Sequence, residues 1–314
     1  QTLFFTVGMQ YNKKIINFSA MTVYAGLLIF FFVVLLSDVK ITTEAFSNIF
    51  NLNNFLDVNN LAPLLTVAGT IFAYFSILII SFGDFSRYVK NEQELKKGNL
   101  SLILNLIIFS FLSVFIVIGS DVFLNQKFSD IDRIFTNPTD IVGKFDNIQI
   151  TIVVLFFIII ASASTNLVAN FIPSQYSLIN FAPSILSLKS ASYLIAFFGL
   201  LIAIFWLTIL SQIGILSFVD TFGAFFGPLF GVMAADYYLI KNQELSNKDL
   251  YSIDKESAYY YSGGWHIKGV YSLILGFIFS ASTIWNTNLM FLQSYAWIIG
   301  AFVAWITYYL LAKK

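Results

Sequence analysis

The residues of this sequence best suited to chemistry are small polar side chains within one long, largely apolar stretch, Ile158–Gln175. An unpaired polar group in apolar surroundings costs free energy on the order of kcal/mol. Five such residues nevertheless fall between positions 162 and 170: Ser162, Ser164, Thr165, Asn166 and Asn170. Hydroxyls and a free helix carbonyl are hard oxygen donors that suit a small cation, and amides suit a polar heterocycle.

On a helix these side chains form two stripes. One stripe follows the spacing i, i+3, i+4 and consists of Ala161, Ser164 and Thr165. The other follows i, i+4, i+8 and consists of Ser162, Asn166 and Asn170. Two polar stripes cannot both face lipid, so we expect this helix inside a bundle, against something polar. Close packing of small residues is the alternative, but it does not account for two asparagines.

Composition places the chain in a membrane. Of its 314 residues, 58% are hydrophobic and only 11% are charged, whereas a soluble domain carries about 25% charged residues. The formal net charge of zero gives no reason to expect nucleic acid as a partner, and the lack of cysteine excludes disulfides and thiol chemistry. The single histidine, His266, lies in a polar loop beside Trp265, where we expect it to be solvated. No enzyme motif is present, so we expect neither catalysis nor a cofactor.

Windows of about 20 apolar residues predict eight membrane-spanning helices. They are Ile16–Leu36, Leu61–Phe82, Leu100–Ser120, Ile148–Ile172, Ala191–Leu210, Ile213–Ala235, Val270–Trp285 and Tyr295–Ala312. The fifth and sixth meet at Ser211-Gln212, which predicts a helical hairpin. The chain opens on Gln1–Met9, which looks like the tail of an earlier apolar segment. We therefore expect an N-terminally truncated fragment.

The distribution of lysine and arginine predicts the orientation. Thirteen of these residues lie in one set of alternate loops and four lie in the other. Cytoplasmic loops carry the excess of positive charge, and the richer set includes the C-terminal Lys313 and Lys314. We expect a multi-pass protein of the inner or plasma membrane with its C-terminus in the cytoplasm.

The second predicted span contains an aromatic candidate. Pro63 and Gly69 weaken its first half, and a Gly/Pro-interrupted membrane helix points to a transporter site. Phe75 follows the weakened half and shares a face with Phe72. Because the chain has 36 phenylalanines, Phe75 is by default a core or lipid-facing residue.

The sixth predicted span holds Asp220 and a glycine series. A carboxylate within the membrane is by default a functional candidate; the alternative is a carboxylate held by the helix dipole at the interface. Gly223, Gly227 and Gly231 recur at every fourth position, which predicts close helix packing.

Three stretches resemble the nucleobase–cation symporter-1 family, the cytosine, purine, uracil, allantoin and hydantoin permeases. They are GDFSRY (Gly83–Tyr88), ASASTNLVANFIPSQYSLINFAP (Ala161–Pro183) and FGPLFGVMAADYYLIK (Phe226–Lys241). The resemblance covers essentially the whole chain in span order and loop lengths. It implies an all-α membrane protein with the leucine-transporter-type fold, in which two inverted five-helix repeats precede two extra helices. The fragment would hold about eight transmembrane helices, the fifth to the twelfth of twelve.

In that register, residues 1–314 form a single transporter domain. Residues 1–36 would end the first repeat, residues 61–240 would form the second inverted repeat, and residues 270–314 would form the two appended helices. The first and third helices of the family, which carry half of the ion site and two substrate contacts, would be absent.

The resemblance also implies a role for each candidate residue. The family's sodium site uses a backbone carbonyl and two hydroxyls of the eighth helix, which match Ala161, Ser164 and Thr165. The family's substrate-binding asparagine matches Asn170, and Asn166 lies one turn before it as a further candidate.

The aromatic position departs from the family pattern. Phe75 stands where the family has a stacking tryptophan, and Gly83 stands where it usually has a proline. A phenyl ring offers a smaller stacking face and no N–H donor.

We therefore expect a secondary active transporter that takes up a nucleobase or related planar heterocycle, namely uracil, cytosine, a purine, allantoin or hydantoin. A cation, preferably sodium, would drive uptake by alternating access. The alternative is a proton-coupled permease for a vitamin-like solute such as thiamine, with Asp220 as a possible coupling carboxylate. A receptor or structural membrane protein is a third class. The expected partners are the heterocycle, the cation and the lipid bilayer, with the protein acting as a monomer.

Overall fold

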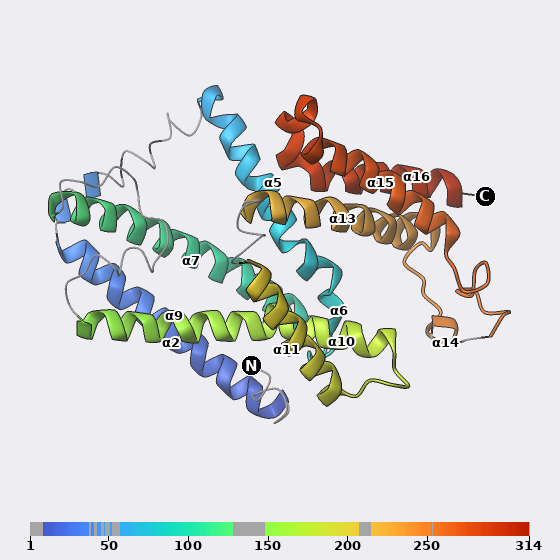
Figure 1. Cartoon of the computed structure of the whole chain (residues 1–314), viewed down its shortest axis with the longest axis horizontal. Helices are drawn as coiled ribbons and strands as arrows, with labels where there is room; N and C mark the ends of the chain where they lie inside the picture. The colour runs from blue at the N-terminus through green and yellow to red at the C-terminus, as the bar shows by residue number, and fades with distance from the viewer. Residues whose placement is uncertain are drawn as a thin grey trace. The chain divides into compact units, whose positions relative to one another are not determined.

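The computed structural model is built of helices (Figure 1). It describes residues 9–37, 39–40, 43–44, 47, 51, 57–127, 148–206, 215–250, 252 and 254–313. Within these ranges, eight helical stretches are long and apolar enough to cross a membrane: Lys13–Phe32, Val58–Ile80, Glu92–Ser120, Thr151–Phe181, Leu188–Phe205, Phe218–Ile240, Ile267–Trp285 and Thr287–Ala312. The predicted all-α membrane protein with eight spans is confirmed.

The helices differ from the predicted spans mainly at their ends. α2 (Met9–Ser37) begins before the predicted Ile16, and α7 (Glu92–Lys127) begins before the predicted Leu100. Hydropathy does not register the lysines, glutamates and glutamines of these first turns, which are good helix formers. The predicted hairpin at Ser211-Gln212 lies outside the described residues, as does all of Gln1–Met9 except Met9.

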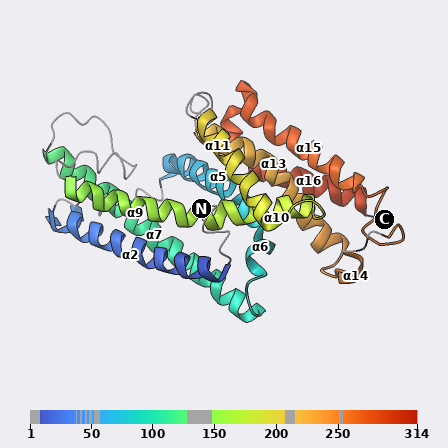
Figure 2. The same cartoon turned by 60° about the horizontal axis from the view of Figure 1, so that its bottom comes forward.

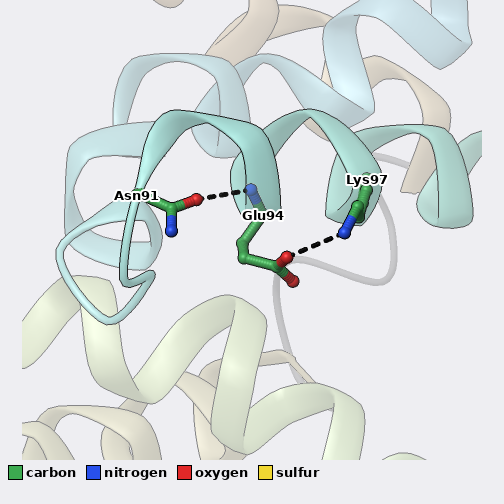
Figure 3. A network of polar contacts seen from close by, with 3 residues as sticks. All are labelled: Asn91, Glu94 and Lys97. Carbon is green, nitrogen blue, oxygen red and sulfur yellow. Dashed lines mark hydrogen bonds and ion pairs between the residues drawn. The ribbon is translucent and has the colours of Figure 1, made fainter.

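α7 shows how a helix of this chain begins in polar sequence. The Asn91 side-chain oxygen accepts a hydrogen bond from the Glu94 backbone N–H at 2.9 Å, and the Lys97 ammonium pairs with the Glu94 carboxylate at 2.9 Å (Figure 3). Such a cap satisfies a free backbone donor, and acidic residues in a first turn complement the helix dipole. With 36 residues, α7 is about 54 Å long, well over the roughly 30 Å of a bilayer core. α7 is therefore longer than a bilayer-spanning helix needs to be.

The chain divides into two compact units. Unit 1 takes its described residues from Gln1–Leu56 and Asp84–Leu201. In it, α2 contacts both α7 and α9 (Ile148–Asn166). α9 continues through the π-helical segment η1 (Leu167–Phe171) into α10 (Ile172–Phe181), and α11 (Leu188–Phe205) follows. Large apolar side chains at the η1 segment form a buried cluster in this unit: Leu167, Phe171 and Ile172, with Ile16, Tyr176 and Ile195 against them.

Unit 2 takes its described residues from Asp57–Gly83 and Ile202–Lys314. α13 (Ile215–Ala235), α15 (Ile267–Trp285) and α16 (Ala296–Ala312) contact one another and lie side by side in Figures 1 and 2. α5 (Val58–Ile80) packs on α13 and on the 3-10 segment η4 (Thr287–Tyr295). Shorter elements are α6 (Phe82–Ser86), where the two units meet in sequence, the π segment η3 (Asp236–Ile240) and α14 (Asn247–Leu250).

Glycines set the distance between the helices of unit 2. A Cβ on Gly227 would overlap the backbone carbonyl of Trp297, and one on Gly231 would overlap that of Ala301. A Cβ on Gly223 would come within 2.6 Å of the Cβ of Ala73. No side chain fits at these positions while the helix backbones stay in contact. The glycine series of α13 is therefore a packing surface, as the sequence predicted.

This packing predicts the effect of one added side chain. Replacing Gly227 by valine forces α13 away from α16 and should lower the free energy of unfolding by about 1–3 kcal/mol, as overpacked cores do. Thermal unfolding of the detergent-solubilised protein measures the change. Gly199→Ala in α11 is the matched control, because a Cβ at Gly199 meets nothing within 4 Å. An unchanged melting temperature for Gly227→Val would contradict the packing role.

Candidate functional site

The polar stretch of unit 1 surrounds a change of helix geometry. The Ile172 backbone N–H donates to the carbonyl of Leu167, five residues earlier, which defines the π-helical segment η1. Pro173 lies in the first turn of α10 and has no N–H to give to the carbonyl of Ala169, four residues before it. Single π turns inside α-helices occur frequently at functional sites.

The predicted site residues form two hydrogen-bonded pairs on this helix. The Ser164 hydroxyl donates to the Ala161 carbonyl, with 3.1 Å between the two oxygens. The Asn170 side-chain amide donates to the Asn166 side-chain oxygen at 2.6 Å. The structure thus brings two hard oxygen donors together on α9 and two amides together at η1.

Burial differs between the two faces of the segment. Leu167 and Phe171 are buried, whereas Thr165, Asn166 and Asn170 are exposed. Ala161 and Ser164 are partly buried, and the expectation that both polar stripes lie inside a bundle stays a prediction. Hydropathy and periodicity identified the polar face of this helix but could not predict which other helices, if any, pack against it.

The π segment also changes the angular relation between the two pairs. On a straight α-helix, Asn170 would point away from the face of Ala161, because each residue adds about 100°. A π turn contains more residues than an α turn, so that projection does not hold beyond Leu167. Asn166 precedes η1 and Asn170 lies within it, and their amides meet across this widened turn.

Two stretches singled out in the sequence meet at Tyr176 of α10. The Arg87 guanidinium carbon lies 4.3 Å from the Tyr176 ring centroid, and the hydroxyls of Tyr88 and Tyr176 form a hydrogen bond. Burial, followed by this hydrogen bond, raises the pKa of Tyr88. Burial also raises the pKa of Asp84, and the nearby Arg87 opposes that rise. The GDFSRY stretch is thereby attached to the helix that follows η1.

Gln175 is a buried residue for which the sequence analysis predicted no role. Its side-chain amide donates to the Leu188 carbonyl at 2.8 Å and to the Ser192 hydroxyl at 2.7 Å. The Ser192 hydroxyl donates in turn to the Leu188 carbonyl at 2.7 Å. These bonds join α10 to the start of α11, on the far side of the turn at 182–187.

The aromatic candidates of α5 lie in unit 2. Phe75 is half-buried, and its ring meets Tyr74 edge to face at 5.2 Å between centroids. Phe72 stacks on Trp297 with 5.6 Å between centroids and 22° between the planes. Phe72 thus contacts α16 while 46% of its surface is exposed, and the stacking role of Phe75 stays a prediction. Asn170 belongs to unit 1, so the predicted pairing of Phe75 with Asn170 stays a prediction.

Asp220 is buried in unit 2, with 4% of its surface exposed. It lies in the second turn of α13, and its carboxylate accepts a hydrogen bond at 2.8 Å from the side-chain amide of Gln293 in η4. The amide of Gln293 gives this buried carboxylate a side-chain partner, and the two interpretations of Asp220, functional carboxylate and residue held by the helix dipole, both stay predictions. Sequence periodicity could not supply the partner, because Gln293 lies far along the chain.

His266 departs from its expected solvation. It is half-buried, its ring stacks on Tyr261, and its Nε2 atom lies 3.1 Å from the Tyr308 hydroxyl. The expectation was wrong because a polar loop can fold back onto the helix ends that it connects. Among the residues that the structure describes, no group of three or more His, Cys, Asp or Glu side chains is placed to hold a metal ion.

Eight apolar helical stretches, one of them containing the π-helical segment η1, define a multi-pass membrane protein. The family described as permeases for cytosine/purines, uracil, thiamine and allantoin matches residues 4–309, and the chain belongs to that family.

Individual relatives are similar to this chain over different shares of its length. It is 28% identical to the allantoin permease of Bacillus subtilis over 244 residues, which cover 77% of the chain and 48% of that relative. It is 25% identical to a purine-uracil permease of Arabidopsis thaliana over 77% of the chain and 41% of the relative. A hydantoin permease of Microbacterium maritypicum is 29% identical over 45% of the chain and 28% of its own length. The chain spans about half the length of the curated relatives it matches most fully, and no solved structure matches it.

The contacts of Tyr176 predict a graded loss of stability. Tyr176→Phe keeps the ring below Arg87 and removes the hydrogen bond with Tyr88, which should cost about 0.5–1.5 kcal/mol of unfolding free energy. Tyr176→Leu removes the ring as well and should cost roughly a further 0.5–1 kcal/mol, the usual size of an exposed cation–π contact. Thermal unfolding of both variants measures the two steps. Equal melting temperatures for phenylalanine and leucine would show that the Arg87 contact contributes nothing.

Proposed function

We propose that this chain is part of a secondary active transporter that takes up a nucleobase or related planar heterocycle together with a cation, by alternating access. Family membership supports the substrate class, since relatives bear the names of allantoin, purine-uracil and hydantoin permeases. The observation that carries the proposal is the polar face of the α9–η1 segment, where an oxygen pair and an amide pair adjoin a π turn within a membrane span.

The ion site of the proposal consists of the Ala161 carbonyl and the hydroxyls of Ser164 and Thr165. These groups fit sodium because all are hard oxygen donors and because two of the oxygens already lie 3.1 Å apart. The Ser164 hydroxyl donates its hydrogen to the Ala161 carbonyl, and a cation that takes both oxygens replaces that bond. The remaining ligands of the proposed site would come from other helices of the transporter.

The substrate site of the proposal consists of Asn170, Asn166 and Phe75. The two amides offer donors and acceptors that match the edge of a heterocycle such as uracil, cytosine, a purine, allantoin or hydantoin. Phe75 would supply a stacking face. Coupling is thermodynamic, since the cation favours uptake only by binding the substrate-competent state more tightly.

The proposed architecture is the leucine-transporter-type inverted repeat. The eight spans are the fifth to the twelfth of twelve, with residues 61–240 as the second repeat and residues 270–314 as the appended pair. The C-terminus lies in the cytoplasm, because the loops on that side carry thirteen of the seventeen lysines and arginines. The protein acts as a monomer.

A proton-coupled permease for a vitamin-like solute is the second candidate. Its support is Asp220, a buried carboxylate whose described partner is the amide of Gln293 and not a cation. Such a group can take up and release a proton within a membrane. The family description also includes thiamine.

Loss of the Thr165 hydroxyl tests the ion site. Thr165→Ala removes one oxygen from a site with few ligands, so the sodium concentration for half-maximal uptake should rise several-fold. Substrate affinity should fall at limiting sodium and recover at high sodium. Uptake by the protein in proteoliposomes, measured over a sodium series, reports both. Thr151→Ala on the same helix is the control. If the sodium dependence is unchanged, Ser164 and Thr165 serve helix packing and not ion binding.

Loss of the Asn170 amide tests the substrate site. Asn170→Ala removes one or two hydrogen bonds to a desolvated ligand, which should weaken binding by about 1–3 kcal/mol. Isothermal titration across allantoin, hydantoin, uracil, cytosine and thiamine measures the loss and identifies the ligand class. Asn180→Ala, an exposed asparagine of α10, is the matched control. Native affinity in Asn170→Ala would make this residue structural.

A further inference from the structure

A pocket of about 200 Å³ lies at one end of the helices of unit 2. Its lining includes Ile240, Ile267 and Ala312, each of which is the terminal residue of a membrane span. The thickness of the hydrocarbon core sets where an apolar span ends. Three spans end together at this pocket, which places it at the depth of the lipid headgroups.

Aromatic side chains around the pocket fit the same depth. Tryptophan and tyrosine are enriched at membrane–water interfaces, because one end of each side chain is apolar and the other is polar. Tyr261 lines the pocket, and Trp265 and Tyr271 are exposed close to the start of α15. The pocket therefore opens among side chains that suit the headgroup layer.

Hydrogen bonds and a ring contact form one wall of the pocket. The Tyr308 hydroxyl of α16 donates to the Asp236 carboxylate of η3 at 2.6 Å and lies 3.1 Å from the Nε2 atom of His266. The ring of Tyr261 stacks on His266, with 3.9 Å between centroids and 9° between the planes. These contacts link η3, α16 and the residue before α15, so the protein itself forms this wall.

Lysine side chains give the pocket a net positive charge. Lys241 directly follows η3, Lys268 is the second residue of α15, and both line the pocket. The described lining contains one acidic residue, Asp236. Burial lowers the pKa of His266, so its ring is uncharged near neutral pH. The described lining therefore holds two positive charges and one negative charge.

Neither lysine of the pocket has a carboxylate partner within the described chain. The ion pairs found there belong to Lys96 and Lys97, in unit 1. The Lys241 ammonium lies 4.6 Å from the ring centroid of Tyr259 instead. An ammonium group carries three hydrogen-bond donors, so both lysines can bind an oxygen anion without first breaking an ion pair.

We propose that this pocket binds the phosphate group of an anionic lipid headgroup. Lys241 and Lys268 bind its oxygens, and the Ser262 hydroxyl in the same lining can donate to a further one. Basic pockets between membrane helices bind phosphate-bearing headgroups in this way. The Asp236 carboxylate repels a phosphomonoester of roughly two charges more than a phosphodiester of one. A lipid phosphodiester therefore fits the pocket better than free phosphate does.

The positions of the two lysines give binding a measurable effect on stability. Lys241 begins the segment between η3 and α15, and Lys268 lies just beyond the end of that segment. A phosphate held by both lysines joins the two ends of the segment, so it stabilises the folded protein by mass action. The melting temperature therefore reports binding without any measurement of transport.

Thermal unfolding of the detergent-solubilised protein with three added ligands tests the site. Phosphatidylglycerol supplies an anionic headgroup, phosphatidylcholine supplies a zwitterionic one, and inorganic phosphate at constant ionic strength supplies the free anion. We expect phosphatidylglycerol to raise the melting temperature at concentrations at least about tenfold below those of the other two. Equal effects of the two lipids overturn the proposal. A half-maximal effect of inorganic phosphate at an equal or lower concentration assigns the pocket to a free anion and overturns the lipid headgroup.

Charge variants separate this pocket from diffuse attraction to the protein surface. Lys241→Gln and Lys268→Gln should each raise the half-maximal phosphatidylglycerol concentration about fivefold, the effect of one lysine near an anionic headgroup. Lys255→Gln removes an exposed lysine of the same segment outside the pocket and should leave that concentration unchanged. Asp236→Asn still accepts the hydrogen bond of Tyr308 and should lower it at least about twofold. An equal loss in Lys255→Gln, or no change in either pocket lysine variant, overturns the proposal.

Discussion

Backbone hydrogen bonding is the constraint from which the rest of this structure follows. In hydrocarbon, each N–H and C=O must find a partner inside the protein, which is why the spans are helical. Any departure from the i to i−4 pattern must be compensated nearby. At η1, the Ile172 N–H reaches the Leu167 carbonyl instead, and large apolar side chains surround the widened turn. The amide pair Asn166–Asn170 thus lies where the backbone itself is least regular.

The helices of the two units pack through side chains of different size. In unit 2, glycines and alanines allow backbones to approach until Gly227 and Gly231 abut the carbonyls of α16. Such contacts rely on dispersion and shape, since lipid offers no hydrophobic driving force between helices. In unit 1, the buried cluster is made of Leu167, Phe171 and Ile172. Unit 2 therefore has little tolerance for added volume, whereas the helix that carries the amides is held by larger side chains.

The sequence predicted the helices and the polar residues better than it predicted contacts. Hydropathy found all eight spans because about 20 apolar residues in a row have few other uses. The glycine series was interpreted correctly because only a close approach explains its spacing. The π turn was missed, because Pro173 marks a possible irregularity without specifying its form. The bonds of Asp220 to Gln293 and of Tyr308 to Asp236 were missed because each joins residues more than 70 positions apart.

The π turn also affects how the residues that follow it are rotated about the helix axis. It holds about one residue more than the α turn it replaces, so it behaves as an insertion that the helix absorbs without breaking. Each residue turns a helix by about 100°, so deleting one residue here would rotate everything downstream relative to α9. Gln175 and Tyr176 would then leave their partners on α11 and in the GDFSRY stretch. A single insertion or deletion at this turn can thus change the direction in which the side chains of the second half of the span point, without substituting any of them.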